Sequence, residues 1–200
     1  MKAALSAIPV VGSPAAELFE LVLTPPLSKR RDEWMESVAK RLEGVEAKVD
    51  SMRDDPAFVT TLMHATQIAL RTHQEDKLEA LRNAVVKSAI GKAPTEDLRA
   101  LFLNLVDEFT PTHLRILRLF QNRGSMDVGS IQQLANQREV TDQIVLGLAR
   151  SGLVDDPRPL AAINRKHPEA LVTLNWTLSK LGIQFVEFIS SSGRAAAQSD

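Results

Sequence analysis

The sequence predicts a mainly α-helical protein with two regions and one small β-hairpin near its C-terminal end. Three observations lead to this fold class. Apolar residues recur every three or four positions through most of the chain, which is the spacing of one helix face. Prolines and glycines interrupt this pattern where helices are expected to end, and the stretch 171–176 is rich in β-forming residues.

The composition excludes several classes of protein. The chain has 200 residues, of which 44% are hydrophobic and 24% charged, and its formal net charge is -1. This is the profile of a folded domain, and it gives no global argument for binding nucleic acid or membranes. The absence of cysteine excludes disulfides, thiolate catalysis and cysteine-based metal sites, and it fits a reducing cytoplasm, where we expect the protein.

The most apolar stretch lies at the N-terminus, over residues 3–23. Two prolines, one glycine and two glutamates interrupt it, whereas a membrane span needs about twenty uninterrupted apolar residues. We therefore expect a buried turn and a short amphipathic helix over 14–23. The alternative is peripheral membrane contact through residues 3–31, because the cations Lys29 to Arg31 could meet an anionic surface. Their acidic neighbours make an ordinary charged helix start the preferred interpretation.

Pro25 and Pro26 are expected to end this first helix, because proline lacks an amide donor and disfavours helical geometry in the residue before it. A second helix then begins. The heptad spacing of its apolar residues is short and favours packing inside a bundle, while pairing with an identical helix is the alternative. These residues are Met35, Val38, Leu42, Val45, Val49 and Met52.

Three further helices are expected before residue 110. The first follows two aspartates and a proline and runs over 56–72. The second runs over 75–90 and ends at Gly91, where a left-handed C-cap is expected. The third opens at Thr95, and its apolar set is broad enough to be covered on more than one side: Leu98, Leu101, Phe102, Leu105, Val106 and Phe109.

The pattern changes at Thr110, where threonine followed by proline predicts a helix start. The helix over 111–122 is followed by a Gly-Ser turn and a short helix over 130–137. Thr141 is then expected to cap a helix over 142–151. A short helix, a tight turn and a second helix have the spacing of a helix-turn-helix motif.

The remaining chain predicts the hairpin and a closing helix. A strand near Leu160 is expected to pair with a returning strand over 171–176, and Thr177 to cap the last helix. The small polar tail over 191–200 predicts disorder. The last helix is apolar on too many sides for a surface helix, so we expect it to be buried between the two regions or in a homodimer. Its candidate self-association residues are Ile183, Phe185, Val186, Phe188 and Ile189.

Three segments, FTPTHLRILRLF (109–120), ARSGLVDD (149–156) and LNWTLSKLGIQF (174–185), resemble the winged-helix fold of bacterial regulators of the multiple-antibiotic-resistance repressor class. The resemblance implies a helical region over 1–109 and a winged-helix domain over 110–190. The overall plan is also similar to that of bacterial abortive-infection proteins of the alpha type, which implies a role in phage defence. Winged helices serve both DNA binding and protein docking, so the fold does not select between them.

DNA binding is the sharpest hypothesis for this region. The helix over 142–151 would enter the major groove, where Gln143 could read adenine and Arg150 could reach phosphate. Arg165 and Lys166 lie at the tip of the expected wing, within reach of the DNA backbone. Against this, residues 110–190 contain nine Lys and Arg and seven Asp and Glu, a net charge of +2, while DNA-binding domains usually carry a denser basic face.

The sequence contains no pattern that predicts catalysis. The four histidines, two of which are His64 and His73, do not occur at metal-ligand spacing with a carboxylate between them. No glycine-rich phosphate loop or nucleophile elbow is present. We therefore expect no enzyme activity, no metal and no cofactor.

Three functions remain open. A non-enzymatic regulatory or protein-interaction module, which uses a winged helix for docking or self-association, requires nothing that the residues lack. Its expected partner is a protein, or a second copy of the chain. A DNA-binding transcriptional regulator is the second hypothesis, and a membrane-associated helical effector is the third.

Overall fold

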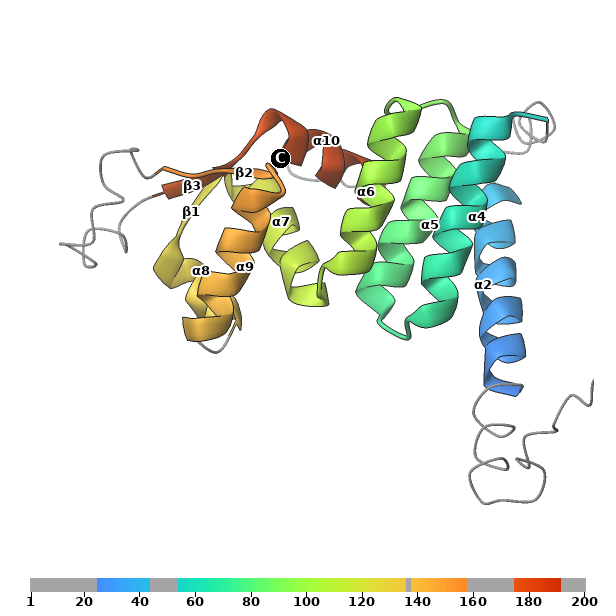
Figure 1. Cartoon of the computed structure of the whole chain (residues 1–200), viewed down its shortest axis with the longest axis horizontal. Helices are drawn as coiled ribbons and strands as arrows, with labels where there is room; N and C mark the ends of the chain where they lie inside the picture. The colour runs from blue at the N-terminus through green and yellow to red at the C-terminus, as the bar shows by residue number, and fades with distance from the viewer. Residues whose placement is uncertain (1–24, 44–53, 136–137, 158–174, 192–200) are drawn as a thin grey trace, which may run out of the picture.

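The computed structural model describes residues 25–43, 54–135, 138–157 and 175–191. These residues form a mainly helical structure with one small antiparallel sheet (Figure 1). Its elements are α2 Pro25–Glu43, α4 Pro56–Arg71, α5 Glu75–Ala89, α6 Glu96–Glu108, α7 Pro111–Arg123, β1 Ser125–Asp127, α8 Val128–Ala135, α9 Arg138–Arg150, β2 Val154–Asp155, β3 Asn175–Leu178 and α10 Lys180–Ile189.

Some of the predictions fall on residues outside these ranges. They are the helix over 14–23, the second half of the heptad stripe, the strand near Leu160, the wing tip at Arg165 and Lys166, and all but the first residue of the tail. Within the described ranges, no helix has both the length and the apolar character needed to cross a membrane.

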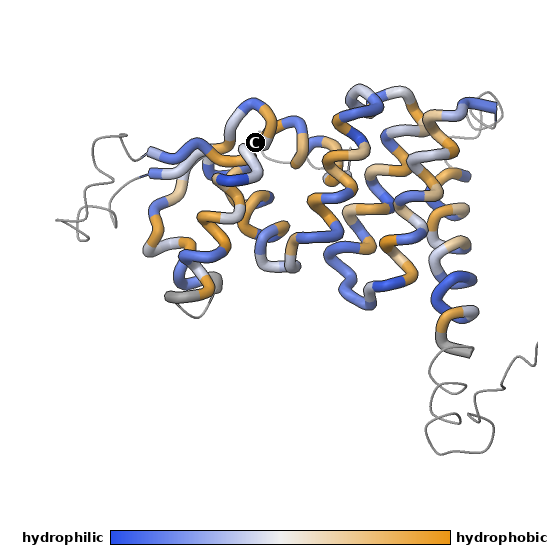
Figure 2. Tube along the Cα trace, viewed as in Figure 1, coloured by the Kyte–Doolittle hydropathy of each residue, from blue (hydrophilic) through white to orange (hydrophobic). Residues whose placement is uncertain are grey.

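Helix α5 is the centre of the N-terminal region. It contacts α2, α4 and α6, which lie side by side with it, and also α7 and α10 of the C-terminal region (Figure 1). Its buried positions include Ala80, Ala84 and Ala89, whose small side chains let neighbouring helices approach closely. The hydropathy colouring follows this arrangement, because the apolar residues of each helix recur along the sides that face other helices (Figure 2).

Two predicted helix boundaries in this region are confirmed, at Asp55 and at Gly91. Asp55 caps α4, and its side chain accepts a hydrogen bond of 2.9 Å from the amide of Ala57. Gly91 follows α5 with a φ of 67°, which an L-amino acid with a side chain rarely adopts. These residues separate helices that could otherwise have continued into one another.

Helix α2 differs from its prediction in two ways. Pro25 and Pro26 form its first turn and do not precede it, which agrees with the tolerance of proline at the first helical positions. The buried face contains Trp34 and Val38, while Met35 is 58% exposed. The Trp34 indole turns inward because its Nε1 donates a hydrogen bond of 3.0 Å to Thr66 Oγ1 on α4.

The sheet in the C-terminal region has three strands in the order β1-β3-β2, and both pairs are antiparallel. The returning strand is β3, which includes Thr177, so the prediction that Thr177 caps the last helix was wrong. Its hairpin partner β2 pairs Val154 with Leu178 and Asp155 with Thr177. Strand β1 was not predicted, because its three residues are too few for an alternating pattern.

The two helices between β1 and β2 start earlier than predicted. Helix α8 begins at Val128, and Asp127 accepts hydrogen bonds from the amide (2.9 Å) and the hydroxyl (2.7 Å) of Ser130. Helix α9 begins at Arg138, so Thr141 is not its cap. Thr141 instead lies within the helix and is fully buried.

Helix α10 is capped by Ser179, whose Oγ accepts a hydrogen bond of 2.9 Å from the amide of Gly182. The helix lies across the top of the molecule in Figure 1 and packs on α5 and α7. Its aromatic rings meet those of α6: Phe185 and Phe102 have ring centroids 5.3 Å apart in an edge contact, and Phe188 and Phe102 are 5.9 Å apart. The two regions therefore share one hydrophobic core, which crosses the expected boundary at residue 110.

This packing corrects the predicted self-association surface. Four of the five candidate residues are buried inside the chain and cannot meet a second copy without unfolding: Phe185, Val186, Phe188 and Ile189. Ile183 alone among the five is exposed, at 46%. The structure thus places the apolar side of α10 between the two regions.

Candidate functional site

The exposed face of α9 carries two of the four residues predicted to contact nucleic acid. Gln143 and Arg150 are both exposed, the first in the middle and the second at the end of this helix. Arg165 and Lys166 lie outside the described residues.

Helix α9 is held by its opposite face, whose apolar side chains pack into the common core. Ile144, Val145 and Leu148 are all at most 5% exposed. Contacts with α8 and β2 fix the helix on two sides. This leaves a face toward solvent that contains Val140, Asp142, Gln143 and Arg150.

The chemistry of this face is close to neutral. Among its described side chains, Asp142 and Arg150 carry opposite charges and Gln143 is uncharged. Val140 is apolar and 40% exposed. Such a face lacks the array of cations that would neutralise several DNA phosphates.

Three arginines of α7 do not form a basic patch with Arg150 in the described part of the chain. Arg118 Nη1 donates a hydrogen bond of 3.3 Å to Asp76 Oδ1 on α5, so its charge is already paired. Arg115 is exposed and donates to Thr112 Oγ1 at 3.2 Å, and Arg123 is exposed at the end of α7.

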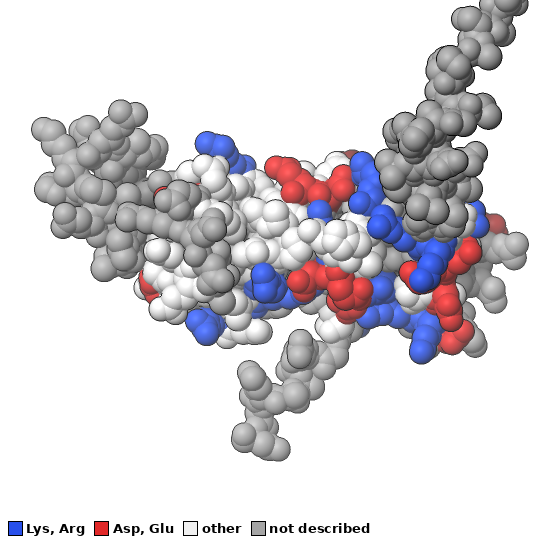
Figure 3. Space-filling model, turned by 90° about the horizontal axis from the view of Figure 1, so that it is seen from below, with Lys and Arg blue, Asp and Glu red and all other residues white. Residues whose placement is uncertain are grey.

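Figure 3 shows the distribution of charged side chains on the face seen from below. Basic and acidic side chains gather together over the end that contains α2, α4 and α5, at the right of the view, and their signs are mixed. The described surface toward the other end is mostly uncharged, with isolated cations. No continuous positive surface is visible on this side.

His113 takes part in ring stacking and in the cap of α7. Its ring stacks on Phe109, with centroids 4.9 Å apart and planes within 2° of parallel. Its Nδ1 lies 2.8 Å from Thr110 Oγ1 and accepts a hydrogen bond of 3.3 Å from the Thr110 amide, which caps α7. Burial, with a smaller contribution from the charge of Lys77, lowers the pKa of His113 below its ordinary value of 6.5. The ring stack contributes to packing, and the hydrogen bond from the Thr110 amide stabilises the start of α7.

No group of three His, Asp or Glu side chains within the described ranges is arranged to hold a metal ion. In the N-terminal region, acidic side chains of α5 form ion pairs with arginines of α2 and α5. Glu79 on α5 accepts a hydrogen bond of 2.5 Å from Arg41 on α2 and a second of 3.4 Å from Arg82. Burial alone would raise the pKa of Glu79, but the hydrogen bonds and charges of the two arginines together lower it.

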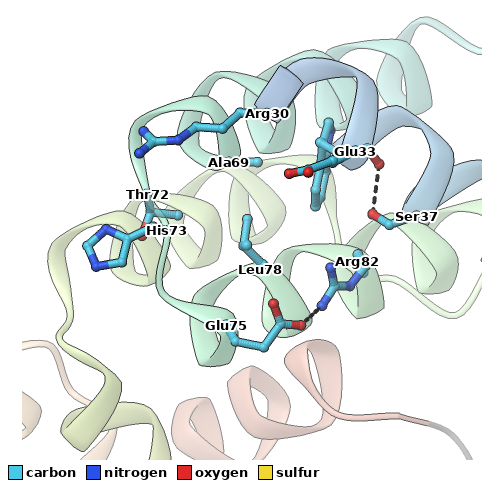
Figure 4. Close-up of a pocket in the computed structure, with 10 residues that line it drawn as sticks. Arg30, Glu33, Ser37, Ala69, Thr72, His73, Glu75, Leu78 and Arg82 are labelled. Atoms are coloured by element: carbon cyan, nitrogen blue, oxygen red, sulfur yellow. Dashed lines mark hydrogen bonds and ion pairs between the residues drawn. The ribbon is translucent and has the colours of Figure 1, made fainter. Parts of the chain in front are cut away.

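One pocket was not predicted from the sequence. It lies between α2, α4 and α5, and Figure 4 shows Arg30, His73 and Leu78 among its lining side chains. Arg30 belongs to the Lys29–Arg31 cluster of the sequence, and no sequence pattern indicates that it lines a pocket with the loop after α4. That loop is irregular, and the pattern of apolar residues does not predict which neighbouring helix it faces.

Comparisons with known proteins give no family or relative for the chain. No family model, no curated protein sequence and no solved structure shows a significant match to it.

Proposed function

We propose that the protein is a non-enzymatic protein-interaction module, in which a helical platform carries a winged helix that docks on another protein. The order α7, β1, α8, α9, β2, β3 and the sheet order β1-β3-β2 support a winged-helix assignment. The sequence resemblance over 110–190 supports it independently. The helix-turn-helix pair is then α8 and α9, and α9 presents the docking face.

The near-neutral face of α9 is the observation that carries the proposal. Val140 offers exposed apolar area, and Gln143 offers a hydrogen-bonding amide. Asp142 and Arg150 provide one charge of each sign around them. Protein interfaces combine an apolar centre with a polar rim and have few charged groups at the core, and this face has that composition. The partner that it fits is a protein surface of low net charge.

Site-specific photo-crosslinking in cells tests this proposal. A photoreactive residue placed at Gln143 is expected to form an adduct with one protein partner, identified by mass spectrometry. Val140→Asp, which replaces the exposed apolar side chain of this face by a charged one, is expected to abolish the adduct. The matched control is Met63→Asp on α4, because Met63 is 59% exposed and lies on another surface. An adduct that survives Val140→Asp, or disappears equally with Met63→Asp, would contradict docking through α9.

DNA binding is the second candidate function, and the exposure of Gln143 in the middle of α9 favours it. In this position a glutamine side chain can form paired hydrogen bonds with adenine. A gel shift at low ionic strength separates the two functions, because phosphate contacts are strongest there. Binding that falls steeply with salt and loses its sequence preference in Gln143→Ala would support a DNA-binding regulator. No shift at low salt would remove it.

A further inference from the structure

The pocket between α2, α4 and α5 has the size of a small-ligand site, and its lining combines three apolar residues with charged and polar ones. Its volume is about 310 Å³, at the lower end of the range for ligand pockets in proteins. Three helices contribute to it, together with the loop after α4, so its shape depends on the packed structure. The lining residues are Arg30, Glu33, Trp34, Ser37, Ala69, Thr72, His73, Glu75, Leu78 and Arg82.

The inner part of the pocket is apolar. Ala69 and Leu78 form part of the lining, and Trp34 adds an aromatic wall. Trp34 is 4% exposed and is fixed by its hydrogen bond to Thr66 on α4. Leu78 lies between the charged side chains in Figure 4. These surfaces would cover the apolar part of a compact ligand.

Some charged side chains that line the pocket form ion pairs and others do not. Among the described residues, Glu33 pairs with Lys29 at 3.6 Å, and Glu75 pairs with Arg82 across the pocket wall. Arg30 and His73 have no hydrogen-bond or ion-pair partner in the described part of the chain, and they lie on the same side of the pocket in Figure 4. Among the charged lining residues, Arg30 is therefore the one without a partner in the described part of the chain.

We propose that this pocket binds a small organic anion. The carboxylate or phosphate group of the ligand lies between the Arg30 guanidinium and the His73 imidazole, and its compact apolar part lies on Leu78 and Ala69 beside Trp34. A guanidinium binds both kinds of anion through paired hydrogen bonds. The proposal is independent of the docking face, which is on α9 in the other region.

Nuclear magnetic resonance of the two tryptophan indoles tests this site. Benzoate and phenyl phosphate are the probes, and benzamide has the shape of benzoate without its charge. Benzoate or phenyl phosphate is expected to shift the indole N–H signal of Trp34 with saturation, while that of Trp176 stays in place. Benzamide is expected to bind about tenfold more weakly, since it lacks the charge-assisted hydrogen bonds. The response of each probe distinguishes a carboxylate site from a phosphate site.

A matched pair of variants identifies the group that binds the anion. Arg30→Gln is expected to weaken binding of the better probe about tenfold. Arg31→Gln removes the same charge from the next residue, which is exposed, pairs with Asp32 and does not line the pocket, so its affinity should equal that of the wild type. The proposal is overturned if neither anion gives a saturable shift of Trp34 up to about 10 mM. Equal binding of benzamide and benzoate, or equal weakening by the two variants, would also overturn it.

Discussion

The side-chain amide of Asn83 donates a hydrogen bond of 2.9 Å to the carbonyl oxygen of Ile189, 106 residues further along the chain. This bond joins the middle of α5 to the last residue of α10. On its other side, the Asn83 carbonyl oxygen accepts a hydrogen bond of 2.8 Å from Arg41 on α2. One buried side chain thus links the first and last described helices through the central one. Lys87 adds to the link, because its Nζ donates to the carbonyl of Glu187, at the end of α10 where a cation is favoured.

Replacement of Asn83 by alanine should therefore destabilise the whole fold. Asn83 is 5% exposed, and its loss leaves the Ile189 carbonyl and the Arg41 guanidinium without this partner. We expect the free energy of unfolding to fall by about 1–3 kcal/mol, as measured by urea denaturation. The control is Asn104→Ala, since Asn104 is exposed on α6, and its effect should stay within about 0.5 kcal/mol. Equal effects of the two variants would contradict the structural role of Asn83.

Two helical glycines should respond oppositely to alanine. A Cβ atom at Gly182 on α10 would lie 1.9 Å from the Leu153 carbonyl oxygen, which is backbone and cannot turn aside. Gly182→Ala should thus cost about 3 kcal/mol or more, because the start of α10 must move away from the backbone that directly precedes β2. At Gly147 on α9 the nearest atom is His113 Nε2 at 3.4 Å, so Gly147→Ala should be tolerated, or should stabilise by up to about 1 kcal/mol through helix propensity. Thermal unfolding of both variants measures the difference. A stable Gly182→Ala protein would show that α10 does not approach Leu153 this closely.

The sequence predicted the described helices well where local chemistry determines them. Asp55, Gly91 and Thr110 mark helix ends through caps and turns, which depend on a few neighbouring residues. The mainly helical fold class and the antiparallel returning strand follow from periodicity and β-forming residues. The prediction was wrong where tertiary contacts determine the secondary structure of a residue. Thr177 resembles a cap in sequence, but it pairs with Asp155 in the sheet.

The candidate sites were harder to predict than the fold. An apolar residue such as Phe185 can be buried against a second copy or against its own chain, and the sequence is the same in both cases. The contact between Phe185 and Phe102 shows that it packs against its own chain. The pocket depends on Arg30 and His73, which are separated in sequence and brought to one side by the packing of α2 on α4. Hydrophobic periodicity contains no information on such a meeting of polar side chains.

The common core should make the two regions unfold together. Phe102 is fully buried and touches two aromatic rings of α10, so Phe102→Ala should cost about 3–5 kcal/mol. Its neighbour Leu101 is 42% exposed, and Leu101→Ala should cost less than about 1 kcal/mol. In a urea titration the indole signals of Trp34 and Trp176 report the two regions in one sample. In the wild type and in each of the two variants, we expect the two indole signals to disappear at the same urea concentration as each other, although this concentration is lowest for Phe102→Ala. A transition of Trp176 that precedes that of Trp34 would instead indicate two independent domains.

The half-buried position of His113 should make stability depend on pH below neutrality. Burial and the charge of Lys77 lower the pKa of His113 in the folded protein below its ordinary value of 6.5, so the unfolded chain binds this proton more readily. The contribution of neutral His113 to the free energy of unfolding is then fully present above the unfolded-state pKa. It is lost as the pH falls from the unfolded-state pKa to the folded-state pKa. Protonation of Nδ1 also removes the acceptor for the Thr110 amide at the start of α7. His113→Gln keeps an acceptor oxygen at this capping position but cannot be protonated, so its stability should decline less between neutral and mildly acidic pH. Urea denaturation of both proteins across this range measures the difference, and a His113 ring that titrates by nuclear magnetic resonance at or above 6.5 would contradict the expectation.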